Sequence, residues 1–168
     1  MLSPVLAFTA EEVWGYLPQQ NKADSVQLAG WPTVNQEYID GQLEERWEKI
    51  IDLRDEVSKT LEKARRDKVI GHSLDAQVNL YLDQELFDFL KNFPEKLDTI
   101  FIVSKVELLQ GATSTPEGTV DSTEYKGLKI QVVKAPGSKC ERCWKYCETV
   151  GQSQVHPQIC SVCETNLK

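Results

Sequence analysis

The sequence predicts an α+β protein with three parts: a partial helical bundle, a small mixed α/β region with a mainly antiparallel sheet, and a C-terminal site for one metal ion. Three patterns support this prediction. Apolar residues recur every three or four positions between residues 40 and 69, two later segments alternate apolar and polar side chains, and two CxxC pairs stand near the C-terminus. The expected parts are residues 1–69, 70–135 and 136–168.

A first helix is expected over residues 4–17. Ser3 suits its N-cap, Pro4 suits its first turn, and Pro18 ends it. The residues left for burial are Val5, Phe8, Val13 and Trp14. Residues 19–39 predict an irregular connection.

The strongest helical pattern covers residues 40–69, with Gly71 as its expected stop. Its apolar stripe is broken only at Arg54 and consists of Leu43, Trp47, Ile50, Val57, Leu61 and Ala64. Such a stripe needs neighbouring helices, and residues 1–39 supply about one. We therefore expect the chain to begin partway through a larger helical bundle. Cations late in this helix, including Arg65 and Arg66, match the helix dipole.

Residues 70–135 predict the small mixed region. Alternation over residues 76–83 indicates a half-buried strand, and residues 84–92 indicate a short helix that Pro94 ends. A second strand is expected within residues 100–109, a polar loop over residues 110–121, and a third strand over residues 128–133.

Composition excludes several classes of protein. No apolar run approaches the length of a membrane span, and the N-terminus has no basic residue before its apolar stretch, which argues against a signal peptide. We therefore expect a cytoplasmic protein without a membrane partner, in a compartment where disulfides are rare.

The net charge of −7 is unevenly distributed. Residues 1–125 hold 12 Lys and Arg against 23 Asp and Glu, a balance of −11, whereas residues 126–168 hold 7 against 3, a balance of +4. A bound polyanion would therefore meet the C-terminal tail, although an incidental run of lysines beside an acidic surface explains the numbers equally well.

The cysteine pattern is Cys140-x2-Cys143-x16-Cys160-x2-Cys163. Two CxxC turns at this separation predict a zinc site, because each turn directs two sulfurs to one side and the two turns complete a tetrahedron. The segment has few apolar residues of its own, so metal binding would supply its folding free energy. Four protein ligands leave no open position, which predicts a structural ion.

Other assignments of these cysteines fit the sequence less well. A redox dithiol would need a single CxxC beside a βαβ unit, and none is predicted here. A disulfide pair does not suit the cytosol. A site of three cysteines and one histidine is open to Cys147 or His156, although His156 precedes Pro157 and better suits a turn. Four thiolates also suit iron, and zinc is preferred as the usual structural ion.

Cations and an aromatic side chain interleave with the ligands. Lys139 precedes the first pair of cysteines, Arg142 lies within it and Lys145 follows it, while Trp144 comes directly after the second cysteine. An exposed aromatic among cations suits base stacking and phosphate contact. Equally, Trp144 can pack over the adjacent sheet as the only large hydrophobic residue of the module.

The chain resembles a known enzyme family along its whole length. Ser3-Pro4-Val5-Leu6-Ala7-Phe8-Thr9-Ala10-Glu11-Glu12-Val13-Trp14 is similar to the helical bundle of class I synthetases for branched aliphatic amino acids. The segments 47–57 and 70–78 resemble the long bundle helix and the junction that follows it. Cys140-Glu141-Arg142-Cys143-Trp144, with His156-Pro157 and the second CxxC, resembles the C-terminal zinc finger of bacterial-type isoleucyl-tRNA synthetases, a four-cysteine finger shared with formamidopyrimidine-DNA glycosylases.

The resemblance implies a tRNA-binding role. In that family the bundle and the C-terminal region hold the anticodon stem-loop of isoleucine tRNA, while distant domains catalyse aminoacylation with ATP and edit errors. The HIGH and KMSKS elements of the catalytic domain are absent here, so no catalytic residue is expected in this chain. Lys139, Arg142, Trp144 and Lys145, with Arg65 and Arg66, are the expected RNA contacts.

Two rival functions remain open on the sequence. The shared finger type is compatible with the C-terminal half of a DNA-repair glycosylase, although those enzymes use an N-terminal proline where this chain has Leu2-Ser3. The second rival function is that of a purely structural zinc module that positions neighbouring domains.

Overall fold

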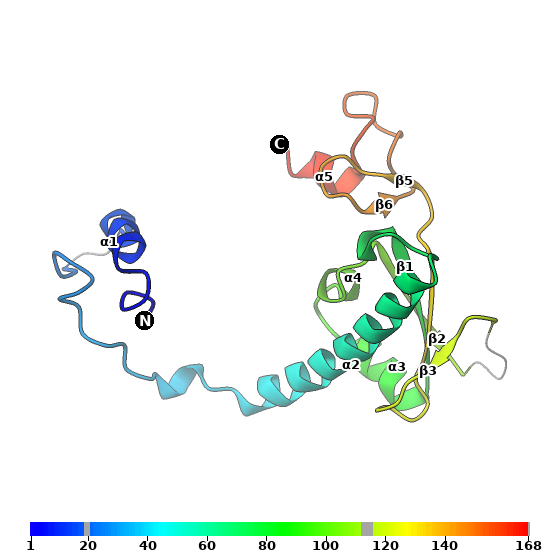
Figure 1. The fold of residues 1–168 in the computed structure, drawn as a ribbon, viewed down its shortest axis with the longest axis horizontal. Coiled ribbons are helices and arrows are strands. Elements are labelled where there is room, and N and C mark those ends of the chain that lie inside the picture. The colour runs from blue at the N-terminus through cyan, green and yellow to red at the C-terminus, as the bar shows by residue number, and fades with distance from the viewer. Residues whose placement is uncertain (19–20, 112–115, 168) are drawn as a thin grey trace. The chain divides into compact units, whose positions relative to one another are not determined.

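The computed structural model describes residues 1–18, 21–111 and 116–167. Two compact units emerge, Met1–Glu44 and Glu45–Lys168. Figure 1 shows the elements of both units along the chain. The predicted loop at residues 110–121 and the predicted connection at residues 19–39 lie in part outside the described residues, as does the last residue of the predicted finger.

The first unit contains helix α1 (Ala7–Tyr16) and a short 3-10 helix (Gln36–Tyr38). The predicted first helix is confirmed, but it begins later than expected, because residues 2–6 form a turn in which Val5 and Leu6 both bond to the carbonyl of Leu2. The prediction that one face of this helix is buried is wrong within this unit. No residue of α1 is buried, and Phe8 is 93% exposed.

Helix α2 (Gly41–Arg66) confirms the predicted long helix. Asp40 caps it by accepting a hydrogen bond from the backbone N–H of Leu43 at 3.0 Å. Beside the exposed Arg54, Leu53 fills the gap in the apolar stripe and is 1% exposed. The buried stripe consists of Ile50, Leu53, Glu56, Val57, Thr60, Leu61 and Ala64.

The C-terminal end of α2 differs from the prediction. Lys68, not Gly71, takes the left-handed conformation, with φ at +59°. The N–H of Val69 reaches the carbonyl of Ala64 at 2.9 Å, and the N–H of Lys68 reaches that of Arg65 at 3.1 Å. These two bonds form a Schellman motif, which ends the helix before the glycine is reached.

A four-stranded mixed sheet follows, with strand order β2-β1-β4-β3. The strands are β1 (Ala76–Leu82), β2 (Lys105–Gln110), β3 (Val120–Asp121) and β4 (Lys129–Lys134). The β1–β4 and β3–β4 pairs are antiparallel, as predicted for most of the sheet, whereas β1 and β2 are parallel.

The parallel pair shows that the prediction of no βαβ unit is wrong. Helices α3 (Gln84–Lys91) and α4 (Leu97–Ile100) connect β1 to β2, so a βαβ crossover is present after all. The strand expected within residues 100–109 begins only at Lys105, because residues 97–100 are helical and Ile102 turns the chain with φ at +55°.

One continuous core joins α2 to the sheet. The buried side of α2 packs in a single cluster with β1 residues Val78 and Leu80 and with Ile130 of β4. In Figure 1, α2 runs across one face of the sheet. The sheet therefore covers the second half of the stripe, for which neighbouring helices were expected.

The cysteine-rich segment forms a small module after Ala135. It contains strands β5 (Ser138–Lys139) and β6 (Tyr146–Cys147), which pair as an antiparallel hairpin, and helix α5 (Ser161–Thr165). Its contacts to the body of the second unit include the backbone N–H of Tyr146, which donates to Oγ of Ser104 at 2.7 Å. Among the described residues, no helix is both long enough and apolar enough to cross a membrane.

Candidate metal centre and nucleic-acid interface

The hairpin and helix α5 bring the four predicted cysteines together. The Sγ atoms of Cys140, Cys143, Cys160 and Cys163 all lie within 4.8 Å of one another. Three of the four side chains are buried, and Cys143 is partly exposed. Cys140 follows β5, and Cys163 lies in α5, so the module closes on itself around the sulfur atoms.

The spacing of the sulfurs fits a tetrahedral ion. A tetrahedron with zinc–sulfur bonds of about 2.3 Å has edges of about 3.8 Å. The Sγ atoms of Cys143 and Cys160 are 3.8 Å apart. The four thiols are ligands of the kind that zinc prefers, and the Cys143–Cys160 separation equals the edge of such a tetrahedron.

Backbone dipoles favour the thiolate form at one corner of the cluster. Burial raises the pKa of Cys140, but the backbone N–H groups of Cys143, Cys160 and Arg142 outweigh this effect and bring the pKa down to about 6. Burial, together with hydrogen bonds to neighbouring thiols, raises the pKa of Cys143 to about 12. Four thiols this close together cannot all ionise unless a cation offsets the repulsion among the thiolates. A divalent metal ion supplies that positive charge.

The remaining candidate ligands lie outside the four-sulfur group. Cys147 packs against the cluster and is half-buried, but it is not one of the four mutually close sulfurs. His156 is exposed, and its backbone N–H donates to Oγ of Ser153 at 3.0 Å, as in a turn. The crossover β1–α3–β2 contains no cysteine, so it does not restore the redox alternative.

The structure separates the predicted RNA contacts of the finger by environment. Trp144 is 60% exposed, and its φ of +65° turns the chain directly after Cys143. The Nζ atom of Lys139 lies 5.5 Å from the centre of the Trp144 ring. Trp144 therefore does not pack over the sheet, and it presents a ring with an adjacent cation to solvent.

The other two cations of the finger take part in internal contacts. Arg142 is exposed, and its Nη1 donates to the carbonyl of Cys163 at 3.0 Å, which ties the first CxxC turn to α5. The Nζ atom of Lys145 lies 2.5 Å from Oδ2 of Asp98 in α4. Lys145 thus joins the finger to the body of the unit.

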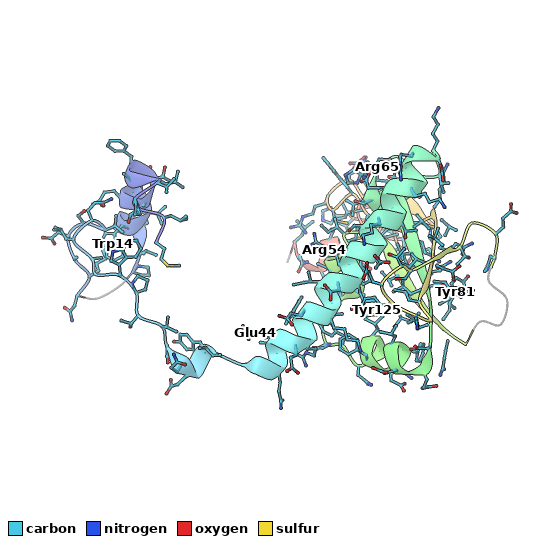
Figure 2. All side chains as sticks on the ribbon, turned by 60° about the horizontal axis from the view of Figure 1, so that its bottom comes forward. Trp14, Glu44, Arg54, Arg65, Tyr81 and Tyr125 are labelled. Atoms are coloured by element: carbon cyan, nitrogen blue, oxygen red, sulfur yellow. The ribbon has the colours of Figure 1, made fainter. Side chains whose placement is uncertain are left out.

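Arg65 and Arg66 lie in the last turn of α2, and Figure 2 labels Arg65 there. Both are exposed, and Arg65 pairs with Glu62 at 2.7 Å. Lys134 was not predicted as a site residue, yet it lines a cleft together with Arg65 and Lys68. No local pattern marks this cleft, because the strand and the helix that supply the cations meet only in the folded chain.

Two family models match parts of the chain. Residues 1–80 match the family model described as the anticodon-binding domain of tRNA ligase, and residues 137–166 match the zinc finger found in FPG and IleRS. The second match covers the four-cysteine module.

Related proteins match the whole chain. Isoleucine–tRNA ligase of Moorella thermoacetica is 48% identical over 169 residues, and that of Thermoanaerobacter sp. is 50% identical over 170 residues. The enzyme of Geobacter sulfurreducens is 47% identical over 169 residues. Each alignment covers 100% of this chain but 18% of the relative, so the chain spans about a fifth of the length of these proteins.

Both predicted features, a structural zinc finger and a family relationship along the whole chain, are therefore confirmed. The finger alone is shared with glycosylases, but the relatives that align over the whole chain are ligases, so the glycosylase alternative is not favoured. The chain is a homologue of the C-terminal region of bacterial isoleucine–tRNA ligases.

Proposed function

We propose that this chain is the tRNA-binding C-terminal region of an isoleucine–tRNA ligase and that it binds the anticodon end of isoleucine tRNA. The observation that carries the proposal is the exposed ring of Trp144 with Lys139 beside it, on a finger that belongs to the basic end of an acidic chain. The match of residues 1–80 to an anticodon-binding domain supports the same partner.

In this proposal Cys140, Cys143, Cys160 and Cys163 hold the zinc ion, whose role is to fold the finger. Trp144 stacks on an unpaired base, while Lys139 and Arg142 contact the phosphates around it. Lys145 is assigned to positioning, because its ammonium group is already bound to Asp98. Arg65 and Arg66 are further candidate phosphate contacts at the end of α2.

Catalysis belongs to other domains of the enzyme in this proposal. The joining of isoleucine to its tRNA with ATP, and the editing of errors, would occur in N-terminal domains for which this chain has no motifs. The cytoplasm is the expected compartment. The functional division into residues 1–69, 70–135 and 136–168 stays a prediction.

The proposal is tested by titrating the zinc-loaded chain with an isoleucine tRNA transcript and measuring binding by fluorescence anisotropy. Replacement of one stacking aromatic costs about 1–3 kcal/mol, so Trp144→Ala should weaken binding roughly 5-fold to 150-fold, and Trp144→Phe should restore part of the loss. Val155→Ala, at a side chain 75% exposed on the same finger, is the control and should bind normally.

A second titration addresses specificity. The same transcript with a replaced anticodon should bind more weakly if the anticodon end is the contact. Equal binding of both transcripts would indicate a general RNA-binding surface that does not depend on the anticodon. No binding to either transcript at low salt would contradict the proposal and favour a purely structural zinc module.

A further inference from the structure

A cleft of about 510 Å³ lies at the root of the finger. Three elements line it: the C-terminal end of α2 with Arg65 and Lys68, the end of β4 with Lys134, and β6 of the finger with Tyr146. Tyr146 stands two residues after Trp144 in the chain. The cleft therefore includes one residue of the finger, from the hairpin strand that follows Trp144.

The lining of the cleft is net positive, with Arg65, Lys68 and Lys134 against Asp75. Asp75 is the acidic residue in its lining, and Oδ2 of this residue is occupied by the backbone N–H groups of Gly71 at 3.1 Å and His72 at 2.7 Å. In the described part of the chain, neither Lys68 nor Lys134 makes an ion pair, and Arg65 has only its exposed pair with Glu62. The lining therefore contributes three cations and one carboxylate, a net positive charge.

The helix dipole alone does not explain these cations. Two of the last carbonyl groups of α2, those of Ala64 and Arg65, are already satisfied by the N–H groups of Val69 and Lys68. Lys134 belongs to a strand, where no such dipole acts. The helix dipole therefore acts on the cations at the end of α2 only, whereas a bound anion would interact with all three side chains.

The backbone of Lys68 is in the left-handed conformation. Its φ of +59° is the left-handed position that ends a helix, where glycine is usual because it has no Cβ penalty. A lysine there is less stable than glycine. Lys68 is one of the residues that line the cleft.

We propose that this cleft binds a phosphate group of the polynucleotide backbone, adjacent to the base held by Trp144. The inference rests on the proposed tRNA-binding function and extends it to Lys68 and Lys134. Arg65 presents a planar guanidinium to the same anion, while the two lysines act as point charges. Arg66, although in the same helical turn, does not line the cleft.

The experiment compares Lys134→Gln and Lys68→Gln with Lys126→Gln in the zinc-loaded chain. Lys126 is an exposed lysine just before β4, and Lys134 ends that strand, so the control removes the same charge roughly 20 Å away. Binding to the isoleucine tRNA transcript is measured at several salt concentrations. Each cleft variant should bind about 3-fold to 10-fold more weakly and lower the salt slope by roughly 0.7–0.9, the value for one lost phosphate contact.

Lys68→Gly separates binding from folding. It should raise the thermal midpoint, because glycine relieves the left-handed backbone, and still weaken binding as Lys68→Gln does. If Trp144→Ala weakens binding while both cleft variants behave like Lys126→Gln, the cleft is not a phosphate site and the proposed function stands. If the unmodified chain fails to bind the transcript at low salt, both proposals are overturned.

Discussion

Asp98 accepts a hydrogen bond from the ammonium group of Lys145, with 2.5 Å between Oδ2 and Nζ. The two side chains are only 29% and 23% exposed. Directly beside this pair, Oγ of Ser104 accepts the backbone N–H of Tyr146 and donates to the carbonyl of Leu74. Two consecutive finger residues are thus fixed to the body of the unit, which sets the direction in which the preceding Trp144 points.

Asp98→Asn should loosen the finger without releasing its metal. A partly buried charged hydrogen bond contributes about 1 kcal/mol, between the values for exposed pairs and for charged bonds in the interior. We expect faster amide exchange at Tyr146 and unchanged zinc content by metal analysis. Glu95→Gln, at a nearby exposed carboxylate, serves as the control. Unchanged exchange in Asp98→Asn would show that the pair does not hold the finger.

Removal of zinc should unfold the finger and leave the sheet intact. The finger has few buried apolar side chains besides its cysteines, whereas the core of α2 and the sheet contains no cysteine. On addition of a chelator, NMR signals of residues 136–167 should collapse while those of β1 and β4 persist. Loss of the sheet signals at the same chelator concentration would contradict this independence.

Cys160→Ser should bind zinc far more weakly than Cys147→Ser. Both changes replace a thiol in the same module, but only Cys160 belongs to the group of four close sulfurs. Cobalt substitution gives the readout, because the thiolate-to-cobalt absorption scales with the number of sulfur ligands. The Cys147→Ser protein should keep the full band. A reduced band in that variant would make Cys147 a ligand.

Glu56 of α2 attaches the segment 120–125 to the helix, and acid should weaken this attachment. Oε2 of Glu56 accepts bonds from Ser122 Oγ at 2.6 Å and from the backbone N–H of Thr123 at 3.0 Å, and Oε1 pairs with Lys59 at 2.6 Å. The hydrogen bond from Lys59, followed by that from Ser122, lowers the pKa of Glu56 from 4.5 to about 2.

The sign follows from this lowered pKa. A carboxylate with a lower pKa in the folded state stabilises that state above pH 4.5, and the contribution is lost as the pH falls from about 4.5 to about 2. We expect a loss of about 1–2 kcal/mol, less than the full shift implies, because Lys59 is exposed to solvent. Urea denaturation across this range measures it. Glu56→Gln should remove that part of the pH dependence, and an unchanged slope would refute the assignment.

Gly137→Ala should displace the finger. At this position φ is +87°, and an added Cβ would lie 2.4 Å from the backbone carbon of Cys147 and 2.5 Å from its oxygen. Gly151→Ala is the matched control, since its φ is +91° but nothing lies within 4 Å of an added Cβ. The control should cost about 1–2 kcal/mol from the left-handed backbone alone, and Gly137→Ala clearly more. Equal losses of thermal stability in the two variants would contradict the close approach.

The sequence by itself determined the features that depend on neighbouring residues. The spacing of the four cysteines predicted the group that the hairpin and α5 assemble, and the three-to-four periodicity predicted α2. The alternation of β1 and β4 predicted two strands of the sheet. These signals are local, because a CxxC turn, a helical face and a pleated strand each follow from residues a few positions apart.

Only the tertiary structure decided the features that join distant segments. The parallel β1–β2 pair, the sheet that covers the stripe of α2, and the pairing of Lys145 with Asp98 link residues far apart in the chain. The periodicity of one segment does not predict which other segment it contacts. From the sequence, Lys145 therefore could not be distinguished from the other cations of the finger. The cleft lined by Lys68 and Lys134 could not be predicted for the same reason. Its two lysines come from different elements, which form one surface only when the chain has folded.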